Sequence, residues 1–344
     1  MRQDSQSNVK AVSRLSVAPM MDWTDRHCRV FHRLFTRRTL LYTEMVTTGA
    51  ILHGPADRLL AHDASEHPVA LQLGGSEPDE LAAATRTGAA HGYDEINLNV
   101  GCPSDRVQSG CFGAALMRDP GRVAECVAAM KETAGDIPVT VKCRIGVDDQ
   151  EPEHVLPDFI ERIRATGICT FIIHARKAWL QGLSPAQNRD IPPLDYGLVG
   201  RMKTRFPDCT IVINGGIPDL KAAQAHLADG LDGVMIGRAA YHNPSLLGSA
   251  DRLIFDAACA DTTAEDAVRA MLPYIERELS QGTRLNQITR HMLGAFQGRP
   301  GARAWRRHLS ENGHLPGAGP ETVEAALSKV MPGQIQDEKV AARG

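Results

Sequence analysis

Cys102 is the residue whose surroundings most suggest chemistry. It lies in Gly101-Cys102-Pro103-Ser104, directly after a strand-like segment. At the end of a strand, a thiol can serve as a nucleophile, a metal ligand or an acid. A thiol that stays protonated is the proton donor that reduction of a polarised C=C bond requires, opposite a hydride donor. From position alone, a catalytic role and a structural role for Cys102 are equally open.

The remaining cysteines indicate no second reactive site. The chain has eight cysteines, with no C-x-x-C pair and no Cys/His cluster at zinc-ligand spacing. In a reducing compartment, scattered cysteines are free thiols, and most of them behave as small buried hydrophobic residues. We therefore expect no metal site.

Polar residues alternate with apolar ones in two consecutive strand-like segments. Asn97 and Asn99 do so in the first segment, and Lys142 and Arg144 in the second. A strand points alternate side chains to opposite faces, so the apolar set suits a helix layer and the polar set points inward. Desolvating a cation without a partner costs several kcal/mol, so an anionic or acceptor-rich ligand should meet these cations. The alternative is that Lys142 only pairs with Glu44 or another carboxylate.

Other segment ends add residues that suit a phosphorylated, flat cofactor. Glycine turns let backbone N–H groups approach a phosphate, an arginine can add a bidentate charge, and a methionine-rich end offers an apolar cover. Flavin mononucleotide (FMN) has a phosphate, a polyol and an aromatic face, and fits this outline. The expected cofactor contacts are Pro19, Met20, Met21, Gln72, Lys142, His174, Asn214, Gly215, Gly216, Gly237 and Arg238.

These segments belong to a regular alternation of strands and helices. The candidate strands are residues 15–20, 40–46, 69–75, 95–101, 139–146, 170–176, 210–216 and 233–238, and the candidate helices between them include 78–91, 120–134, 154–166 and 220–228. Eight such units predict an α/β fold, a TIM (β/α)8 barrel over residues 12–250, with its active site at the C-terminal ends of the strands. An open doubly wound sheet is the alternative, but its G-x-G-x-x-G turn is absent.

The character of the chain changes after residue 250. A helical pattern covers residues 264–312 and predicts a small all-helical domain at 251–312. Residues 284–308 contain arginines but no Asp or Glu, and Arg303 and Arg306 are spaced to share a helix face. This pattern favours phosphate binding, with a solvated basic face as the alternative. We expect residues 1–11 to be flexible and residues 313–344 to be disordered.

The bulk composition is that of an ordinary soluble protein. The chain has 344 residues, of which 43% are hydrophobic and 23% charged, and its formal net charge is -3. This charge does not by itself point to nucleic acid. No secretion signal and no apolar run of about 18 residues is present, so we expect a cytoplasmic protein without membrane contact, and a monomer.

Several motifs, in order, resemble the tRNA-dihydrouridine synthases. They are Ser16-Val17-Ala18-Pro19-Met20, Asn97-Leu98-Asn99-Val100-Gly101-Cys102-Pro103-Ser104, His174-Ala175-Arg176-Lys177 and Asn214-Gly215-Gly216. The stretches 42–45, 178–183 and 188–194 are similar to the bacterial A-type branch in particular. The resemblance spans residues 12–312. It implies a barrel that binds FMN, which NADPH reduces, followed by a helical domain that binds tRNA.

The resemblance also implies a reaction and its residues. The family reduces uridine to 5,6-dihydrouridine, and its A-type branch acts at positions 20 and 20a of the tRNA D-loop. The family's catalytic cysteine falls on Cys102, so hydride would pass from flavin N5 to C6 and a proton from Cys102 to C5. The expected tRNA contacts are Asn99, Lys177, Arg189, Arg303 and Arg306, and the loop 177–193 also carries Trp179, on which a base turned out of its stack would lie.

Two other functions compete with this interpretation. A flavin barrel that acts on a free pyrimidine, such as a dihydroorotate or dihydropyrimidine dehydrogenase, leaves the basic helical domain unexplained. A non-catalytic RNA-binding protein leaves the polar barrel interior unexplained.

Overall fold

Eight parallel strands form a closed barrel in sequence order. The computed structural model describes residues 13–104 and 112–330. The strands are β1 Leu15–Val17, β2 Leu40–Thr47, β3 Val69–Gly74, β4 Glu95–Val100, β5 Val139–Arg144, β6 Thr170–His174, β7 Thr210–Asn214 and β8 Gly233–Ile236. β1 pairs with both β2 and β8, which closes the barrel. The predicted TIM barrel and its eight strands are confirmed.

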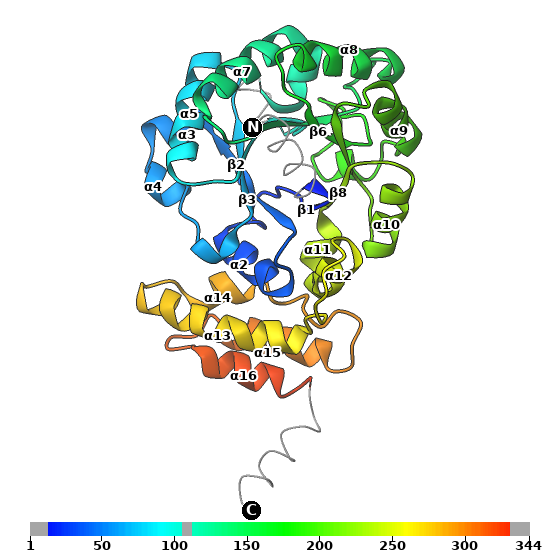
Figure 1. The fold of residues 1–344 in the computed structure, drawn as a ribbon. Coiled ribbons are helices and arrows are strands. Elements are labelled where there is room, and N and C mark those ends of the chain that lie inside the picture. The colour runs from blue at the N-terminus through cyan, green and yellow to red at the C-terminus, as the bar shows by residue number, and fades with distance from the viewer. Residues whose placement is uncertain (1–12, 105–111, 331–344) are drawn as a thin grey trace, which may run out of the picture. The chain divides into compact units, whose positions relative to one another are not determined.

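A ring of helices surrounds these strands (Figure 1). They are α3 Thr48–His53, α4 Ala56–Leu59, α5 Pro78–Ala90, α7 Pro120–Thr133, α8 Pro152–Arg164, α9 Tyr196–Arg205 and α10 Leu220–Ala228, with short 3-10 turns η1 Ala64–Glu66, η2 Gly113–Arg118 and η3 Gln187–Arg189. Aspartates cap several of their starts: Asp119 accepts from the N–H of Arg122 (2.9 Å) and Asp219 from that of Ala222 (2.8 Å). The four helices predicted from the sequence are present.

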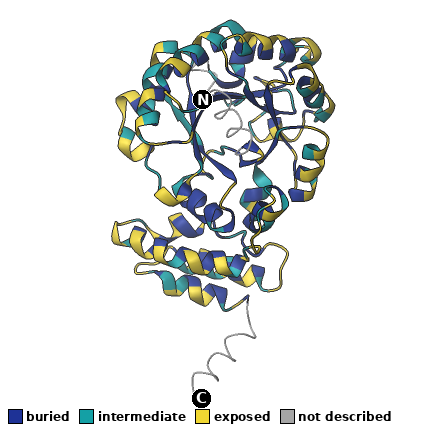
Figure 2. Ribbon diagram, in the orientation of Figure 1, coloured by how far each residue is buried: buried dark blue, intermediate teal, exposed yellow. Residues whose placement is uncertain are grey.

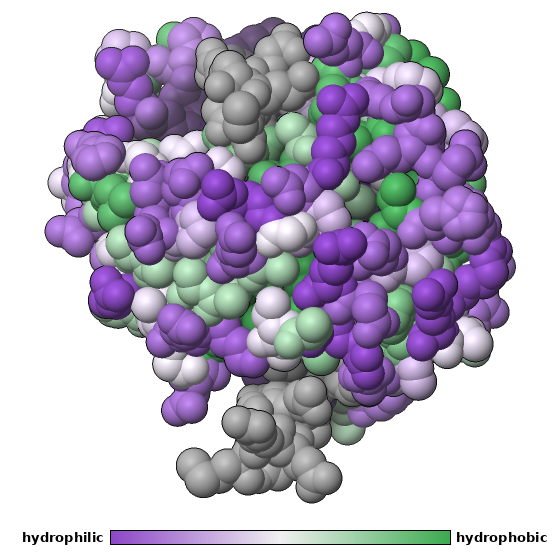
Figure 3. Space-filling view, turned by 90° about the horizontal axis from the view of Figure 1, so that it is seen from above, coloured by the Kyte–Doolittle hydropathy of each residue, from purple (hydrophilic) through white to green (hydrophobic). Residues whose placement is uncertain are grey.

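The strands are buried between this helix ring and the barrel interior (Figure 2). Gly88 shows how closely α5 approaches the sheet, because a Cβ there would lie 2.5 Å from Cδ2 of Leu71 and 3.5 Å from Cδ1 of Ile96. The apolar set of β4 therefore faces the helices, as the alternation predicts. The barrel face on the side of α7 and α8 is mostly hydrophilic (Figure 3). No helix in residues 13–104 or 112–330 has the length and hydropathy to cross a bilayer.

A second compact unit consists, within the described residues, of His27–Arg37 and residues 238–330. Its helices are α2 Arg26–Phe35, α11 Arg238–His242, η4 Pro244–Ser249, α12 Ala250–Leu253, α13 Ala264–Ser280, α14 Leu285–Thr289, α15 Ala302–Asn312 and α16 Pro320–Leu327. Asp251 accepts hydrogen bonds from the hydroxyl of Thr36 (2.6 Å) and the N–H of Arg37 (2.7 Å). These contacts join α2 to the C-terminal helices, so this unit begins before the predicted boundary at residue 251.

The expectation that residues 313–344 are disordered is wrong for residues 313–330. This stretch contains α16, whose side chains Val323, Ala326 and Leu327 are buried, as is Val330. Their spacing is that of one apolar helix face, a signal for order that outweighs the Pro and Gly residues before it. The predicted flexibility of residues 1–11 and of 331–344 falls outside the described residues.

Candidate active site

A chain of side-chain hydrogen bonds runs along the inner face of the barrel. At its base, Glu95 accepts from the hydroxyls of Thr140 (2.7 Å) and Tyr42. Asn97 then donates to Thr140 Oγ1 (2.8 Å), and Gln72 Nε2 donates to Asn97 Oδ1 (2.8 Å). Burial raises the pKa values of Glu95 and Tyr42. The alternate residues of β4 and β5 therefore point inward, as predicted, and the lower ones are paired with one another.

At the C-terminal ends of the strands, this chain of hydrogen bonds reaches the turn that contains Cys102. Asn99 donates from Nδ2 to Gln72 Oε1 (2.7 Å), and its Oδ1 accepts from the N–H groups of Gly101 (3.0 Å) and Cys102 (2.9 Å). The half-buried Cys102 donates from Sγ to Ser104 Oγ at 3.6 Å. Since β4 ends at Val100, the thiol lies at the C-terminal rim of the barrel. A side-chain amide that spans β3 and β4 thus positions it.

Arg144 links two loops of this rim. It donates from Nε to the carbonyl of Gly101 (3.2 Å) and from Nη1 to those of Lys177 (3.2 Å) and Asn188 (2.9 Å). Burial is the main cause that lowers its pKa to about 10, which leaves the guanidinium charged at neutral pH. Strand alternation predicts the inward position of Arg144, but the cation is met by carbonyl groups of the protein. It lies on the same side of β5 as Lys142, so the parity argument that selected Lys142 applies equally to it.

Lys142, beside Asn99 in the strand register, has no such acceptors. Among the described residues it forms no hydrogen bond and no ion pair. The alternative of a pair with Glu44 is not observed, and Glu44 accepts instead from the N–H of Asp22 (2.5 Å). Burial, and then the charge of Arg144, lowers the pKa of Lys142 to about 8. A mostly protonated ammonium therefore lies inside the barrel without a protein acceptor.

The end of β6 adds two more unpartnered groups. Nδ1 of His174 and Nε of Arg176 are buried without a hydrogen-bond partner. Burial, and then the nearby cations, holds the pKa of His174 well below its usual value, so the imidazole is neutral at pH 7. An ammonium, a guanidinium N–H and a neutral imidazole form a donor set for an anionic, acceptor-rich ligand. These residues fit the phosphorylated cofactor expected from the sequence.

The turn after β7 is explained largely by local geometry. Asn214 donates to the carbonyl of Met235 (2.8 Å), and Tyr196 donates to that of Gly215 (2.7 Å). Gly215 and Gly216 have φ angles of 110° and 70°, which favour glycine. A Cβ on Gly216 would also lie 2.6 Å from a side-chain carbon of Leu194. Packing alone therefore accounts for the second glycine.

The ends of β1 and β8 leave more room. A Cβ on Gly237 would meet only Ala18 Cβ (3.6 Å) and Met20 Sδ (3.8 Å), which are ordinary contacts. Met20 packs against the apolar interior of the barrel, whereas Met21 is 57% exposed. Protein packing thus does not require the glycine at 237. The next residue, Arg238, begins α11 in the second unit.

The loop after β6 is organised by a buried asparagine. Asn188 accepts from the N–H of Trp179 (2.7 Å) and donates to the carbonyls of Trp179 (2.9 Å) and Leu183 (3.1 Å). The loop presents Trp179, which is 41% exposed, with Nζ of Lys177 5.6 Å from its ring centroid. Arg189 lies in η3 of the same loop, and its charge contributes to the low pKa of His174. Apart from the resemblance to the family over residues 188–194, no sequence pattern predicts the role of Asn188.

The arginines of the second unit differ from one another. On α15, Arg303 is exposed and Arg306 half-buried, with a long hydrogen bond from Arg306 to Gln297 (3.4 Å). The opposite face buries Trp305, which donates to the carbonyl of Met292 (3.0 Å). Arg299 is paired with Glu265 of α13 (2.9 Å). Residues 284–308 contain no Asp or Glu, but an acidic residue of another helix therefore lies beside them.

The structure thus brings together one part of the predicted site. Gln72, Asn99, Cys102, Lys142, His174 and Asn214 all lie at or near the C-terminal ends of β3 to β7. Arg238, Arg303 and Arg306 belong to the second compact unit.

Comparison with known proteins agrees with this arrangement. The family model described as "Dihydrouridine synthase (Dus)" matches residues 16–331. A protein of Vibrio cholerae serotype O1 named tRNA-dihydrouridine(20/20a) synthase is 61% identical over 318 residues, which are 92% of this chain and 96% of that protein. A protein of Salmonella typhi with the same name is 59% identical over 331 residues, 96% of this chain and 99% of that protein.

Among solved structures, an old yellow enzyme homologue from Zymomonas mobilis is similar with a TM-score of 0.50 and 14% identity, over 74% of this chain and 92% of that one. This likeness concerns the barrel fold alone. The family match, in contrast, covers both compact units and includes the turn that carries Cys102. The chain belongs to the dihydrouridine synthase family.

Proposed function

We propose that this chain reduces the C5=C6 bond of uridine to 5,6-dihydrouridine at positions 20 and 20a of the tRNA D-loop, with FMN as cofactor and NADPH as reductant. The observation that carries the proposal is the position of Cys102, a thiol held at the barrel rim beside unpartnered cationic donors. The names of the similar proteins from Vibrio cholerae and Salmonella typhi support the same substrate and positions.

The unpartnered donors are the residues that would hold FMN. Lys142, His174 and the turn at Gly215 would bind its anionic and acceptor-rich parts, with Met20 and Gly237 beside its flat face. When bound, FMN supplies the hydride that C6 of the uracil accepts. Gln72 is also in the expected set, but its amide is engaged by Asn97 and Asn99. It would support the site by fixing those residues.

Cys102 keeps a proton at Sγ and delivers it to C5 of the uracil. Asn99 acts as a positioning residue, because its Oδ1 accepts hydrogen bonds from the N–H groups of Gly101 and Cys102. Ser104 accepts the thiol hydrogen bond and orients it. A direct contact of Asn99 with the base remains a prediction.

The cations of the rim stabilise the negative charge that develops on the uracil carbonyl during reduction. Arg144 is held by three carbonyl groups and Lys142 has none, so Lys142 is free to meet an anion. Charge stabilisation by groups already in place costs no reorganisation at the moment of reaction. NADPH would dock only transiently, consistent with the absence of a G-x-G-x-x-G turn in the sequence.

For tRNA, we propose two separate contact regions. Trp179 and Lys177, on the loop that Asn188 organises, offer an exposed ring and a charge to a base turned out of its stack. Arg303 and Arg306 on α15 offer phosphate contacts.

The decisive experiment maps dihydrouridine in tRNA from a strain that lacks the gene. We expect loss at positions 20 and 20a, restoration by the wild-type gene and no restoration by Cys102→Ala. Purified protein should carry flavin and should consume NADPH with that tRNA. Unchanged dihydrouridine at both positions would refute the proposed substrate. Efficient reduction of free uracil or orotate would favour the free-pyrimidine alternative.

A further inference from the structure

Two cysteines meet at the end of the barrel opposite the rim. Cys169 directly precedes β6 and Cys209 directly precedes β7. The N–H of Thr210 donates to the carbonyl of Cys169 (2.7 Å), and Thr170 pairs with Thr210 in the strand register. Since β6 has five residues at about 3.3 Å each, this pair lies roughly 16 Å from the rim. It therefore lies outside the site described above.

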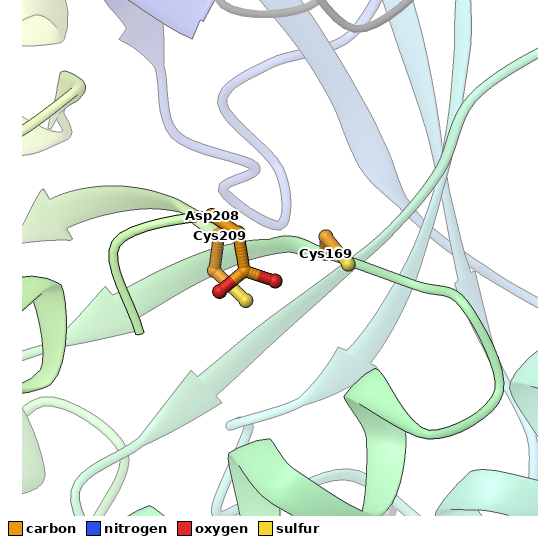
Figure 4. Close-up of side chains that lie close together, drawn as sticks. All are labelled: Cys169, Asp208 and Cys209. Atoms are coloured by element: carbon orange, nitrogen blue, oxygen red, sulfur yellow. The ribbon is translucent and has the colours of Figure 1, made fainter. Parts of the chain in front are cut away.

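Asp208 adds a carboxylate to this pair. One ligand atom each of Cys169, Asp208 and Cys209 lies within 4.8 Å of the others. Figure 4 shows Asp208 and Cys209 side by side on the loop before β7, with Cys169 just before the neighbouring strand β6. Cys209 is buried, Cys169 half-buried and Asp208 exposed, so the cluster is open to solvent on one side. An ion could enter it without rearrangement of the barrel.

We propose that Cys169, Asp208 and Cys209 bind one divalent ion of the zinc class, with water at the fourth position. Two thiolates and a carboxylate suit a borderline-soft ion and are poor ligands for magnesium or calcium. Zinc bonds of about 2.3 Å to sulfur and about 2.0–2.2 Å to oxygen place tetrahedral ligands roughly 3.5–3.8 Å apart. The three ligand atoms lie within 4.8 Å of one another, at most about 1.3 Å more than this, which side-chain rotation can close. Spacing along the chain does not reveal this site, because its cysteines come from different β/α units.

The charges around the cluster affect it in two ways. Arg164 of α8 donates to Oδ2 of Asp208 (2.8 Å) and so competes with an ion for that carboxylate. Lys131 of α7 donates to the carbonyl of Thr166 (3.0 Å), and Lys203 of α9 to that of Cys209 (2.9 Å). Arg164 thus engages a proposed ligand atom, whereas Lys131 and Lys203 bind backbone carbonyl groups.

Cobalt titration of the full-length, metal-free protein under a non-thiol reductant tests the site. We expect one Co²⁺ per chain with thiolate-to-cobalt charge-transfer absorption, and displacement of Co²⁺ by Zn²⁺. Cys169→Ser and Cys209→Ser should each abolish the charge-transfer band or weaken binding by about 100-fold, and Asp208→Asn by about tenfold. Cys259→Ser, which removes an exposed cysteine elsewhere, is the matched control and should change nothing.

Arg164→Met provides a second test that does not depend on the folding of the cysteine variants. Because it frees Asp208 from its ion pair, it should raise the affinity for Co²⁺ severalfold. A spectrum without thiolate charge transfer, or serine variants that both keep the wild-type band intensity and the wild-type affinity, would overturn the proposal. Formation of a Cys169–Cys209 disulfide in place of metal binding, when Co²⁺ is present, also overturns it.

Discussion

The lower and upper parts of the barrel interior both contain polar residues, and they differ in how these residues are paired. Below the rim, Glu95, Thr140 and Asn97 hydrogen-bond to one another and to Gln72. At the rim, Lys142 and His174 retain donors without protein partners in the described residues. A buried polar group without a partner lowers stability, whereas a paired one is close to neutral. We propose that this contrast separates residues that stabilise the barrel from residues that bind a ligand.

The largest effect is expected at Cys102. Cys102→Ala should lower turnover on tRNA by about 10²–10⁴-fold, because only the proton donor is removed. Flavin content and NADPH oxidation with an artificial acceptor should be unchanged. Steady-state and single-turnover kinetics on tRNA measure the effect. Cys143→Ala, which removes a buried thiol on the helix-facing side of β5, is the control, and wild-type dihydrouridine formation by Cys102→Ala would end the assignment.

The second prediction tests the rim side of the contrast. Lys142→Met should weaken FMN binding by roughly 10–100-fold, since one charge-assisted hydrogen bond is lost. The free energy of unfolding without FMN should stay the same or rise, because a desolvated ammonium is removed. FMN titration of the apoprotein and urea unfolding provide the two values. Full FMN affinity together with lower stability would show that Lys142 is structural.

The third prediction tests the paired side. Asn97→Leu should lower the free energy of unfolding by about 1–3 kcal/mol, because the hydroxyl of Thr140 and the amide of Gln72 lose a buried partner. FMN affinity should change much less than in Lys142→Met. If the variant loses FMN before it loses stability, the division between the two parts of the interior is wrong.

A pH titration sharpens the role of Lys142. Its pKa in the free protein is about 8, and a bound anion raises that pKa. Below pH 8 the ammonium is charged in both states, so FMN affinity has its full value. Above pH 8 deprotonation of the free protein competes, and affinity should fall by up to roughly tenfold per pH unit until the pKa of the complex is reached. The Lys142→Met variant should lack this decline, and an identical decline in that variant would assign it to another group.

The smallest effect is expected from substitutions of arginines on α15. Arg303 and Arg306 differ from nearby Arg299, which is paired with Glu265. Arg303→Ala with Arg306→Ala should weaken tRNA binding modestly and flatten its log–log salt dependence by roughly one unit per lost phosphate contact. Arg299→Ala is the control, since Arg299 is already paired with Glu265. FMN content should be unaffected. An unaltered salt slope in the double variant would contradict the assignment.

Much of the fold was predictable because it depends on local periodicity. Strand alternation predicted that Asn97 and Lys142 point inward, and the structure confirms the parity for Asn97 through its bond to Thr140. The partners of these residues were not predictable, because they come from neighbouring strands. The same limit hid the acceptors of Arg144 and the contact between Cys169 and Cys209.

The errors at the domain level have a related cause. Residues 27–37 contact the C-terminal helices through hydrogen bonds to Asp251 and Tyr274. No sequence pattern within either segment predicts these contacts. The helix at Pro320–Leu327 did carry a periodic signal, but the glycines before it suggested disorder.

The buried side chain of Asn188 has a consequence for engineering. Its hydrogen bonds link the two ends of residues 179–188. The carbonyl of Asn188 accepts from Arg144 (2.9 Å), and the N–H of Leu180 donates to Asp148 Oδ1 (2.8 Å). The segment contributes backbone groups to both bonds, so this attachment imposes little demand on the identity of its own side chains. We therefore expect that the loop can be transferred from one barrel to another, provided that the donor brings its own Asn188 and the recipient keeps Arg144 and Asp148. Exchange of this segment would be a route to altered substrate choice that leaves Cys102 in place.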